Sequence, residues 1–298
     1  MICLSLVGHL TIDEILVGGR RYESMGGVVC YAGLAARALG ARVRIFSKVG
    51  RDFPESYLRI LRAAGIDVSH VEADAPHTTR FQLDYSGDER VVRVPSWAGG
   101  LELNPEHHIE ADAVYLGPVA WEFDLESVKR FSAVLEKVAL DPQGLMRVPD
   151  EVGLIRLKQV DLTLPNLWIL RVSREEAETL SGRVSPDQIL ERLRAFNAKI
   201  TILTLGRLGS LIACGSKRFK VPSYETRVED PTGAGDVFGG AFIVELLESR
   251  DARWAAAMGS AMASISVEKP SFQALLSDGV LDEARRRAEE VYELIEEL

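Results

Sequence analysis

The sequence has few cysteines and no apolar stretch long enough to cross a membrane. Its three cysteines, Cys3, Cys30 and Cys214, lie far apart among apolar neighbours, which is typical of buried thiols rather than of a metal or redox site. No apolar run reaches the roughly 18 residues of a membrane span. The first residues also lack the basic start of a signal peptide, so we expect a cytoplasmic protein.

Basic residues are also fewer than acidic residues. The chain has 35 Lys and Arg residues against 44 Asp and Glu, which gives a net charge of -9 and an isoelectric point near 5.2. Such a surface repels nucleic acid and anionic membranes, so neither is an expected partner. The 298 residues are 47% hydrophobic, enough for a large core, and we expect residues 1–298 to form a single domain.

Several well-known catalytic motifs are missing. The sequence contains no P-loop, no nucleophile elbow of the Gly-x-Ser-x-Gly type and no zinc-binding His-Glu-x-x-His helix. The glycines at 233, 235 and 239 miss the dinucleotide-binding spacing by one residue and lie near the C-terminal end of the chain. These absences argue against P-loop nucleotide hydrolases, serine hydrolases, zinc proteases and Rossmann dehydrogenases.

Short apolar runs alternate with helical patterns along most of the chain. Continuous apolar segments such as 2–7, 43–49, 167–172 and 200–205 are typical of strands that are buried on both faces. Their alternation with helices predicts an α/β fold with a doubly wound, mostly parallel sheet flanked by helices. The last helix is expected over 282–297 and should pack on the body of the protein.

Two polar segments interrupt this pattern. Residues 12–25 read as a strand or hairpin, and residues 78–94 alternate on either side of a turn at 86–88, as an antiparallel hairpin does. They predict a small protruding β-sheet that forms a lid over the crevice at the strand C-termini. Because an exposed sheet face or edge invites pairing, a homodimer through this lid is a further hypothesis.

The most informative stretch is the glycine-rich loop Asp230-Pro231-Thr232-Gly233-Ala234-Gly235-Asp236, which leads into an apolar helix at 237–247. Its glycines leave the backbone accessible, and amides at a helix N-terminus attract anions. A carboxylate in this position suits phosphoryl transfer, because the amides hold the phosphoryl oxygens while Asp236 accepts the proton of the attacking hydroxyl. In the simpler alternative, Asp236 only caps the helix.

This loop resembles the hallmark of the ribokinase-like (PfkB-type) carbohydrate kinases. The segments 26–27, 47–52 and 64–67 resemble the N-terminal half of that family, and 204–209 resembles its nucleotide-side strand and turn. The resemblance covers nearly the whole chain in order. It implies a ribokinase-like fold and a kinase that uses ATP with Mg²⁺ to phosphorylate a hydroxyl of a small polyol, sugar or nucleoside.

The resemblance also implies a role for individual positions. Asp236 is the expected catalytic base, and Gly233, Ala234 and Gly235 form the expected anion hole. The residues expected on the substrate side are Asp13, Gly26, Gly27, Tyr31, Arg80, Gln82, Gln143 and Arg147. Those expected on the nucleotide side are Thr204, Gly206, Gly209, Ser260 and Ser264. Two acids are linked to ions: Glu176 indirectly to magnesium, and Asp230 to the monovalent cation that some members bind.

Two positions depart from the family pattern. Ser173 stands where an Asn often precedes the acid equivalent to Glu176, which puts the water network around magnesium in doubt. Tyr31 stands where an Asn often binds sugar hydroxyls, which argues against ribokinase itself. The Asp-Pro-Gln at 141–143, Arg147 and Ser173 most resemble the inositol-kinase branch, so myo-inositol is the preferred acceptor.

Other hypotheses stay open at this point. The chain could be a nucleoside kinase of the same fold, or a non-catalytic sugar-binding or regulatory protein that kept the pocket. Asp13 could be a structural acid, Glu176 a solvated acid on a helix face, and Arg147 a surface charge. The intact Asp236 and its glycines favour the kinases over the binding protein.

Overall fold

The computed structural model describes residues 1–87 and 90–298, so residues 88–89 of the predicted hairpin lie outside the described residues. The strands of the main sheet are β1 (Cys3–Val7), β4 (Arg42–Gly50), β5 (Asp67–Ala75), β8 (Ala113–Leu116), β9 (Val138–Leu140), β12 (Leu167–Ser173), β13 (Ile200–Thr204), β14 (Ser210–Cys214), β15 (Lys217–Val221) and β16 (Glu296–Glu297). The helices are α1 (Val28–Ala38), α2 (Glu55–Ala63), α3 (Leu125–Val134), α4 (Gln143–Met146), α5 (Arg174–Ser181), α6 (Pro186–Leu193), α7 (Ala234–Ser249), α8 (Ala252–Ser266) and α9 (Val280–Glu293).

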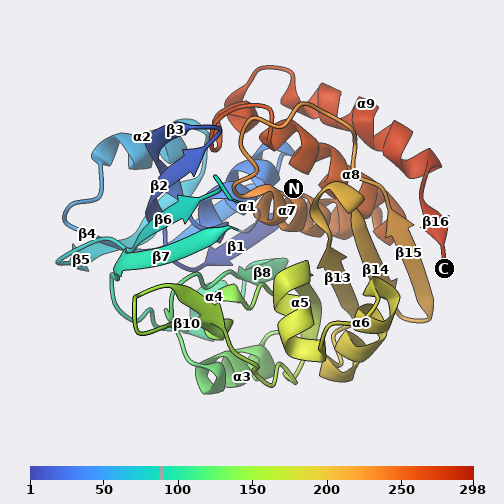
Figure 1. Ribbon diagram of the computed structural model, residues 1–298, viewed down its shortest axis with the longest axis horizontal. Helices are drawn as coiled ribbons and strands as arrows, with labels where there is room; N and C mark the ends of the chain where they lie inside the picture. Colours follow the sequence, from blue (N-terminus) through green and yellow to red (C-terminus); the bar gives the residue numbers. More distant parts are fainter. Residues whose placement is uncertain (88–89) are drawn as a thin grey trace.

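The main sheet has ten strands within the described residues, in the order β16-β15-β14-β13-β12-β9-β8-β1-β4-β5. Every neighbouring pair from β13 to β5 is parallel, and β14, β15 and β16 add an antiparallel edge. Figure 1 shows this sheet running through the molecule. The mostly parallel α/β sheet predicted from the apolar runs is thereby confirmed.

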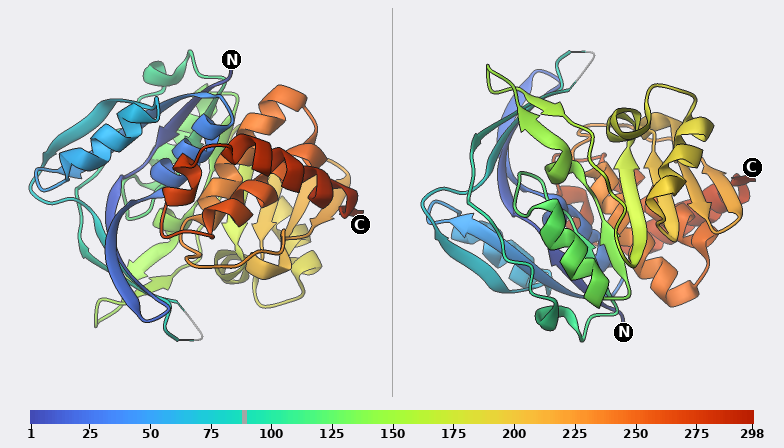
Figure 2. Two further views of the ribbon diagram at one scale, coloured as in Figure 1. Left: turned by 90° about the horizontal axis from the view of Figure 1, so that it is seen from above. Right: turned by 90° about the horizontal axis from the view of Figure 1, so that it is seen from below.

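Helices cover both faces of the main sheet, as the views in Figure 2 show. One face is covered by α1, α2, α7, α8 and α9, whose apolar side chains join a large core. The other face is covered by α3, α5 and α6, which contribute to a second core. Strands between two apolar layers must be apolar on both sides, which explains their uninterrupted hydrophobic sequences.

A second sheet of four strands lies beside the main sheet. It consists of β2 (Thr11–Val17), β3 (Arg20–Gly26), β6 (Arg80–Asp84) and β7 (Val91–Ser96), in the order β3-β2-β6-β7. We call it the lid sheet. It confirms the small additional sheet predicted from the two polar segments. A further pair, β10 (Arg147–Pro149) and β11 (Ile155–Leu157), forms a two-stranded ribbon.

The structure corrects several predicted boundaries. The last helix ends at Glu293 instead of continuing to residue 297, and Glu296–Glu297 pair with β15 as an edge strand. Helix α7 begins at Ala234, so Asp236 lies within its first turn. Strand β5 was missed because its polar sequence, with exposed side chains, is that of a sheet edge and lacks the apolar run of a central strand. Among the described residues, no helix has the length and apolarity that a membrane crossing requires.

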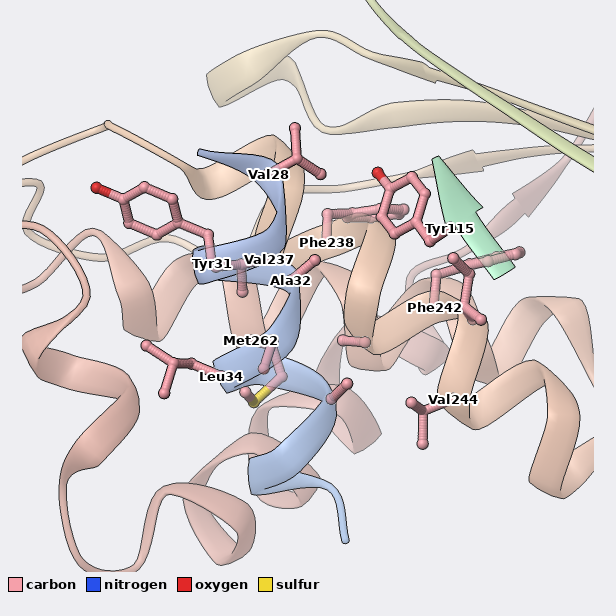
Figure 3. Close-up of a cluster of buried hydrophobic side chains, with 14 of the residues drawn as sticks. Val28, Tyr31, Ala32, Leu34, Tyr115, Val237, Phe238, Phe242, Val244 and Met262 are labelled. Atoms are coloured by element: carbon pink, nitrogen blue, oxygen red, sulfur yellow. The ribbon is translucent and has the colours of Figure 1, made fainter. Parts of the chain in front are cut away.

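Helix α7 is apolar on nearly all sides and is buried along most of its length. Figure 3 shows how it packs against α1, with Val237 of α7 near Tyr31 and Ala32 of α1. The two backbones meet at Gly240, where an added Cβ would lie 2.5 Å from the carbonyl oxygen and 2.7 Å from the Cα of Ala32. The helix that follows the glycine-rich loop is therefore fixed in the centre of the protein.

This contact makes Gly240→Ala a test of the packing. Alanine favours a helix over glycine by roughly 0.5–1 kcal/mol, but here its methyl group meets the backbone of Ala32, which cannot rotate away. We expect a net loss of about 1–3 kcal/mol in the free energy of unfolding, measured by denaturant titration. The matched control is Glu248→Ala, an exposed position of the same helix, which should change stability by less than about 0.5 kcal/mol. An unchanged or higher stability for Gly240→Ala would contradict this packing.

Candidate active site

The glycine-rich loop ends where α7 starts, and it presents the first amides of that helix. Gly233 is the N-cap in the left-handed conformation, with φ of 76°. Val237 N–H donates to the Gly233 carbonyl over 2.9 Å, so the amides of Gly235 and Asp236 precede the first α-helical hydrogen bond. Such amides, together with the helix dipole, attract an anion. This geometry is that of an anion-binding site at the N-terminus of α7.

The glycines of this loop are also required by what lies against them. A Cβ on Gly233 would lie 2.4 Å from the ring of Tyr31, and one on Gly235 would lie 2.3 Å from Nη1 of Arg171. The sequence argument attributed both glycines to close approach of a ligand. In the structure they also allow the loop to pack directly on α1 and β12.

Asp236 is the partly exposed acid of this site, with 15% of its side chain accessible. Its Oδ1 accepts a hydrogen bond from Nη2 of Arg171 over 3.0 Å, and the same nitrogen forms an ion pair with Asp141 Oδ2. Burial raises the pKa of Asp236, and the charge of Arg171 opposes that rise. A carboxylate with a raised pKa beside an anion site is suited to accept a proton from a hydroxyl.

Asp13 lies on β2 and is almost completely buried. Its Oδ1 accepts a hydrogen bond from Thr11 over 2.6 Å, and Gly26 packs so closely that a Cβ there would lie 1.9 Å from Oδ2. Gly27, with φ of 92°, is the N-cap of α1 and packs against the carbonyl of His9. Burial, with a smaller contribution from the charge of Asp236, raises the pKa of Asp13 to about 7, so the two acids are electrostatically coupled.

Arg147 is buried beside this pair of acids. Its Nη1 donates to the Val119 carbonyl over 2.7 Å, and its guanidinium lies 5.0 Å from the ring centroid of Phe81. Burial lowers the pKa of Arg147 to about 10, and its charge in turn stabilises ionised Asp13 and Asp236. The alternative that Arg147 is a surface charge is wrong. Gln143 begins α4 nearby, and its backbone N–H donates to Asp141 Oδ1 over 3.4 Å.

Arg80 and Gln82 do not lie on this side of the lid sheet. In the β2–β6 pairing, Phe81 is opposite Asp13 and Gln82 is opposite Glu14. Because side chains alternate along a strand, Phe81 shares the face of Asp13, while Arg80 and Gln82 point to the other face. There Arg80 pairs with Glu23 over 2.9 Å and Gln82 with Glu14 over 2.9 Å. Their assignment to the substrate side was wrong, because it was made without knowing which face of β6 points inward.

Tyr31 supports the loop from below. It is 1% exposed, its ring packs against Gly233, and its hydroxyl lies 3.1 Å from Ser271 Oγ. A buried hydroxyl that already has a protein partner does not extend into the space above the loop. The structure thus corrects the expected contact of Tyr31 with the substrate.

The expected nucleotide-side residues lie at the C-terminal end of β13, in the turn that follows it, and on α8. Thr204 ends β13, and its hydroxyl donates to the Val172 carbonyl over 3.3 Å. Gly206 and Gly209 form the following turn with φ of 60° and 86°. The hydroxyls of Ser260 and Ser264 donate to backbone carbonyls of Pro222 and Ala261. The bond from Ser260 connects α8 to the segment after β15, whereas the bond from Ser264 lies within α8. A role in nucleotide binding stays a prediction for all five residues.

Glu176 and Ser173 together cap the N-terminus of α5, which gives a structural reason for the serine at position 173. Ser173 is the N-cap of α5 and forms a capping box with Glu176, whose Oε2 accepts from Ser173 N–H over 2.7 Å. Glu176 is 6% exposed, so the alternative of a solvated acid is wrong. Its charge raises the pKa of Asp236. In the described part of the chain, no three His, Cys, Asp or Glu side chains form a group that could hold a metal ion.

Asp230 connects the loop to the lid sheet. Its Oδ2 accepts a hydrogen bond from the hydroxyl of Tyr22 on β3 and another from Ser271 N–H over 2.6 Å. Its Oδ1 accepts from Thr232 N–H over 2.9 Å. Protein donors therefore already use both oxygens of the carboxylate. Its expected role at a monovalent cation stays a prediction.

Sequence reasoning missed Arg171 and Asp141 as members of the site. Leu140 and Leu170 are paired across β9 and β12, so the next residues, Asp141 and Arg171, lie side by side beneath Asp236. One signal was available, since Arg171 is a charged residue in an otherwise apolar strand. Its partner could not be inferred without the strand order.

Comparison with known proteins agrees with this geometry. A family model described as pfkB family carbohydrate kinase matches residues 13–278. A cytidine kinase of Thermococcus kodakarensis is 27% identical over 82% of this chain and 88% of that protein. An inositol 3-kinase of Arabidopsis thaliana is 27% identical over 95% of this chain and 79% of that protein. A solved pyrophosphate-dependent kinase of the ribokinase family, in complex with a pyrophosphate analogue and myo-inositol, superimposes with a TM-score of 0.80 at 24% identity, over 91% of this chain and 98% of its own.

The raised pKa of Asp13 predicts a pH-dependent stability. In the folded protein this carboxyl stays protonated up to about pH 7, whereas its ordinary value is 3.8. The stabilisation that results is complete below about pH 4 and is lost as the pH rises to 7. Relative to Asp13→Asn, the free energy of unfolding of the wild type should fall by on the order of a few kcal/mol across this range and stay flat above it. Denaturant titrations at several pH values measure this difference.

The control for this series is Asp187→Asn, an exposed acid of α6. Its stability should follow that of the wild type at every pH. A difference between wild type and Asp13→Asn that does not change from pH 4 to 8 would contradict the buried, protonated state of Asp13.

Proposed function

Because the chain belongs to the PfkB family of carbohydrate kinases, we propose that it transfers the γ-phosphoryl group of ATP to a hydroxyl of a small polyol, with myo-inositol as the acceptor. The family establishes an ATP-dependent kinase of a small sugar or nucleoside; the polyol is our proposal. The observation that carries it is the position of Asp236, a partly exposed acid with a raised pKa in the first turn of α7.

In the proposed reaction, Asp236 accepts the proton of the acceptor hydroxyl. The hydroxyl oxygen forms a bond to the γ-phosphorus of ATP while the bond from that phosphorus to the bridging oxygen breaks, and ADP leaves. The amides of Gly233, Ala234 and Gly235 hold the negative charge on the transferred group. The lid sheet reduces access of water, which would otherwise compete with the acceptor.

Two features of the acceptor side favour a polyol over a nucleoside. Asp13 and Arg147 are a buried acceptor and a buried donor of hydrogen bonds, which suits hydroxyl groups on a small ring. Phe81, the aromatic ring on the inner face of β6, has the Arg147 guanidinium over one face and is only 4% exposed, so it offers no open face for stacking a base. The inositol 3-kinase among the relatives supports the same choice. The cytidine kinase supports the alternative, a nucleoside acceptor.

Magnesium is proposed to accompany ATP. Mg²⁺ is commonly bound by one or two carboxylates together with substrate phosphates, which suits a site with acids but without a three-ligand cluster among the described residues. Glu176, a buried acid whose charge raises the pKa of Asp236, is the residue that would hold it, through water. The ion would neutralise charge on the phosphates.

The acceptor is tested by measuring ADP formation with ATP and Mg²⁺ and a panel of myo-inositol, ribose, fructose, cytidine and adenosine. We expect the highest kcat/KM with myo-inositol. A higher value with cytidine or adenosine would support the nucleoside alternative, and pyrophosphate in place of ATP tests the donor. Binding of an acceptor without phosphoryl transfer from either donor would instead support a non-catalytic binding protein.

Asp236→Asn tests the catalytic base. The amide keeps the shape of the side chain but cannot accept the proton, so kcat should fall by at least about 100-fold. The dissociation constant for ATP, measured by calorimetry, should stay within a few-fold of the wild type. Near-normal turnover of this variant would refute the assigned role. The capping alternative is already excluded, because Gly233 is the N-cap of α7 and no side chain of the described residues caps this helix.

We further propose a homodimer that forms through the lid sheet. Val91 on the edge strand β7 and Trp97 directly after it are 38% and 46% exposed. The outer edge of β7 is bridged at Arg93, to Leu154, and the rest of an edge strand can pair with another chain. Sedimentation equilibrium measures this association, and a monomer at high concentration would exclude it.

A further inference from the structure

A buried arginine lies directly beneath the catalytic loop. Arg171 is 5% exposed, and it lies on β12, in the middle of the main sheet. Its guanidinium forms ion pairs with Asp236 and with Asp141. Asp141 is fully buried, whereas Asp236 is partly open to the site. One cation is thus shared by two acids, of which only one can reach a substrate.

The contacts around Arg171 restrict its movement. The first turn of α7 rests on the guanidinium at Gly235, where a Cβ would lie 2.3 Å from Nη1. One turn further, Gly239 packs in the same way on the hydroxyl of Tyr115, at 2.4 Å. Among the residues that the structure describes, Nε of Arg171 has no hydrogen-bond partner although it is buried. Packing and the two carboxylates therefore fix this side chain.

Asp236 faces charged groups from several elements. The cations are Arg171 on β12, Arg147 at the start of β10 and Arg90 ahead of β7. The acids are Glu176 on α5, Asp13 on β2 and, through Arg171, Asp141 after β9. Tyr115 on β8 and Cys30 on α1 are the further titratable neighbours. Arg171 is the cation that forms an ion pair with Asp236.

We propose that Arg171 is a positioning residue that holds Asp236 in the ionised form and orientation needed to accept the acceptor proton, and that Asp141 tunes it by taking up part of its charge. A guanidinium paired with Asp236 alone would make the carboxylate a weaker base. Without any guanidinium, the buried carboxylate would stay protonated to a higher pH. The inference rests on the proposed role of Asp236 as the base.

The proposal predicts shifts of opposite sign for the two partners. Removing the arginine should raise the pKa of Asp236 by about one to three pH units, the usual influence of an adjacent arginine on a carboxylate. Asp141→Asn removes a competing negative charge and leaves Arg171 to Asp236, so the same pKa should fall. A structural role alone predicts a loss of stability in both variants and no such pair of shifts.

The experiment follows the carboxyl of Asp236 by ¹³C NMR during a pH titration, with its signal identified by its loss in Asp236→Asn. Because Arg171→Met would leave the buried carboxylate of Asp141 without a partner, the arginine is removed in the double variant Arg171→Met/Asp141→Asn, in which position 141 is neutral. We expect this double variant to titrate above the wild type, Asp141→Asn below it, and Arg171→Lys between the wild type and the double variant. The acidic limb of the pH profile of kcat/KM should move in the same directions. At pH 7, kcat of the double variant should be at least tenfold lower than that of the wild type, with KM for ATP within about threefold of the wild-type value.

The matched control is Arg44→Met. Arg44 is also a strand arginine with a buried Nε lacking a partner in the described part of the chain, but it lies on β4, away from Asp236, and should leave the titration unchanged. A folded double variant in which Asp236 titrates as in the wild type would overturn the proposal. The NMR result does not depend on turnover, so a wild type that phosphorylates no acceptor would contradict the proposed function while the predicted shifts could still be observed.

Discussion

Close contact between helix α7 and its neighbours, made possible by glycine, is the constraint on which the rest of the structure depends. Gly233, Gly235, Gly239 and Gly240 meet in turn a tyrosine ring, a guanidinium, a phenol and a helix backbone. Each contact is too short for any side chain. The amides at the start of α7 and the carboxylate of Asp236 are thereby held at fixed positions over the carboxyl ends of the central strands, where ligands bind in sheets of this kind.

The lid sheet is attached to the same loop by side chains from two of its strands. Tyr22 on β3 donates to Asp230, and Tyr85, directly after β6, lies 3.2 Å from the hydroxyl of Thr232. Ser24 on β3 bonds Ser271, which also contacts Asp230. The glycine-rich loop and the lid sheet are therefore parts of one hydrogen-bonded unit. A displacement of the lid sheet would change the position of the loop as well.

The sequence was most informative where the relevant residues are contiguous. The loop from Asp230 to Asp236 and the apolar runs of the buried strands could be recognised because spacing along the chain determines them. The face of Arg80 and Gln82 depends on the register between β2 and β6, and the pairing of Arg171 with Asp141 depends on β9 lying beside β12. Such relations arise only when segments distant in sequence are brought together. Edge strands such as β5 were missed because partial exposure removes their apolar pattern.

The packing of the loop also limits how it can be exchanged between proteins. Its seven residues fit this molecule because Tyr31 fills the space beneath Gly233 and Arg171 the space beneath Gly235. Those two side chains come from α1 and β12, far away in the sequence. Transplanting the loop into another α/β scaffold would reproduce the motif but leave voids below it, and the amides would lose their fixed direction. The unit that can be transferred by design is the loop together with the residues on which it rests.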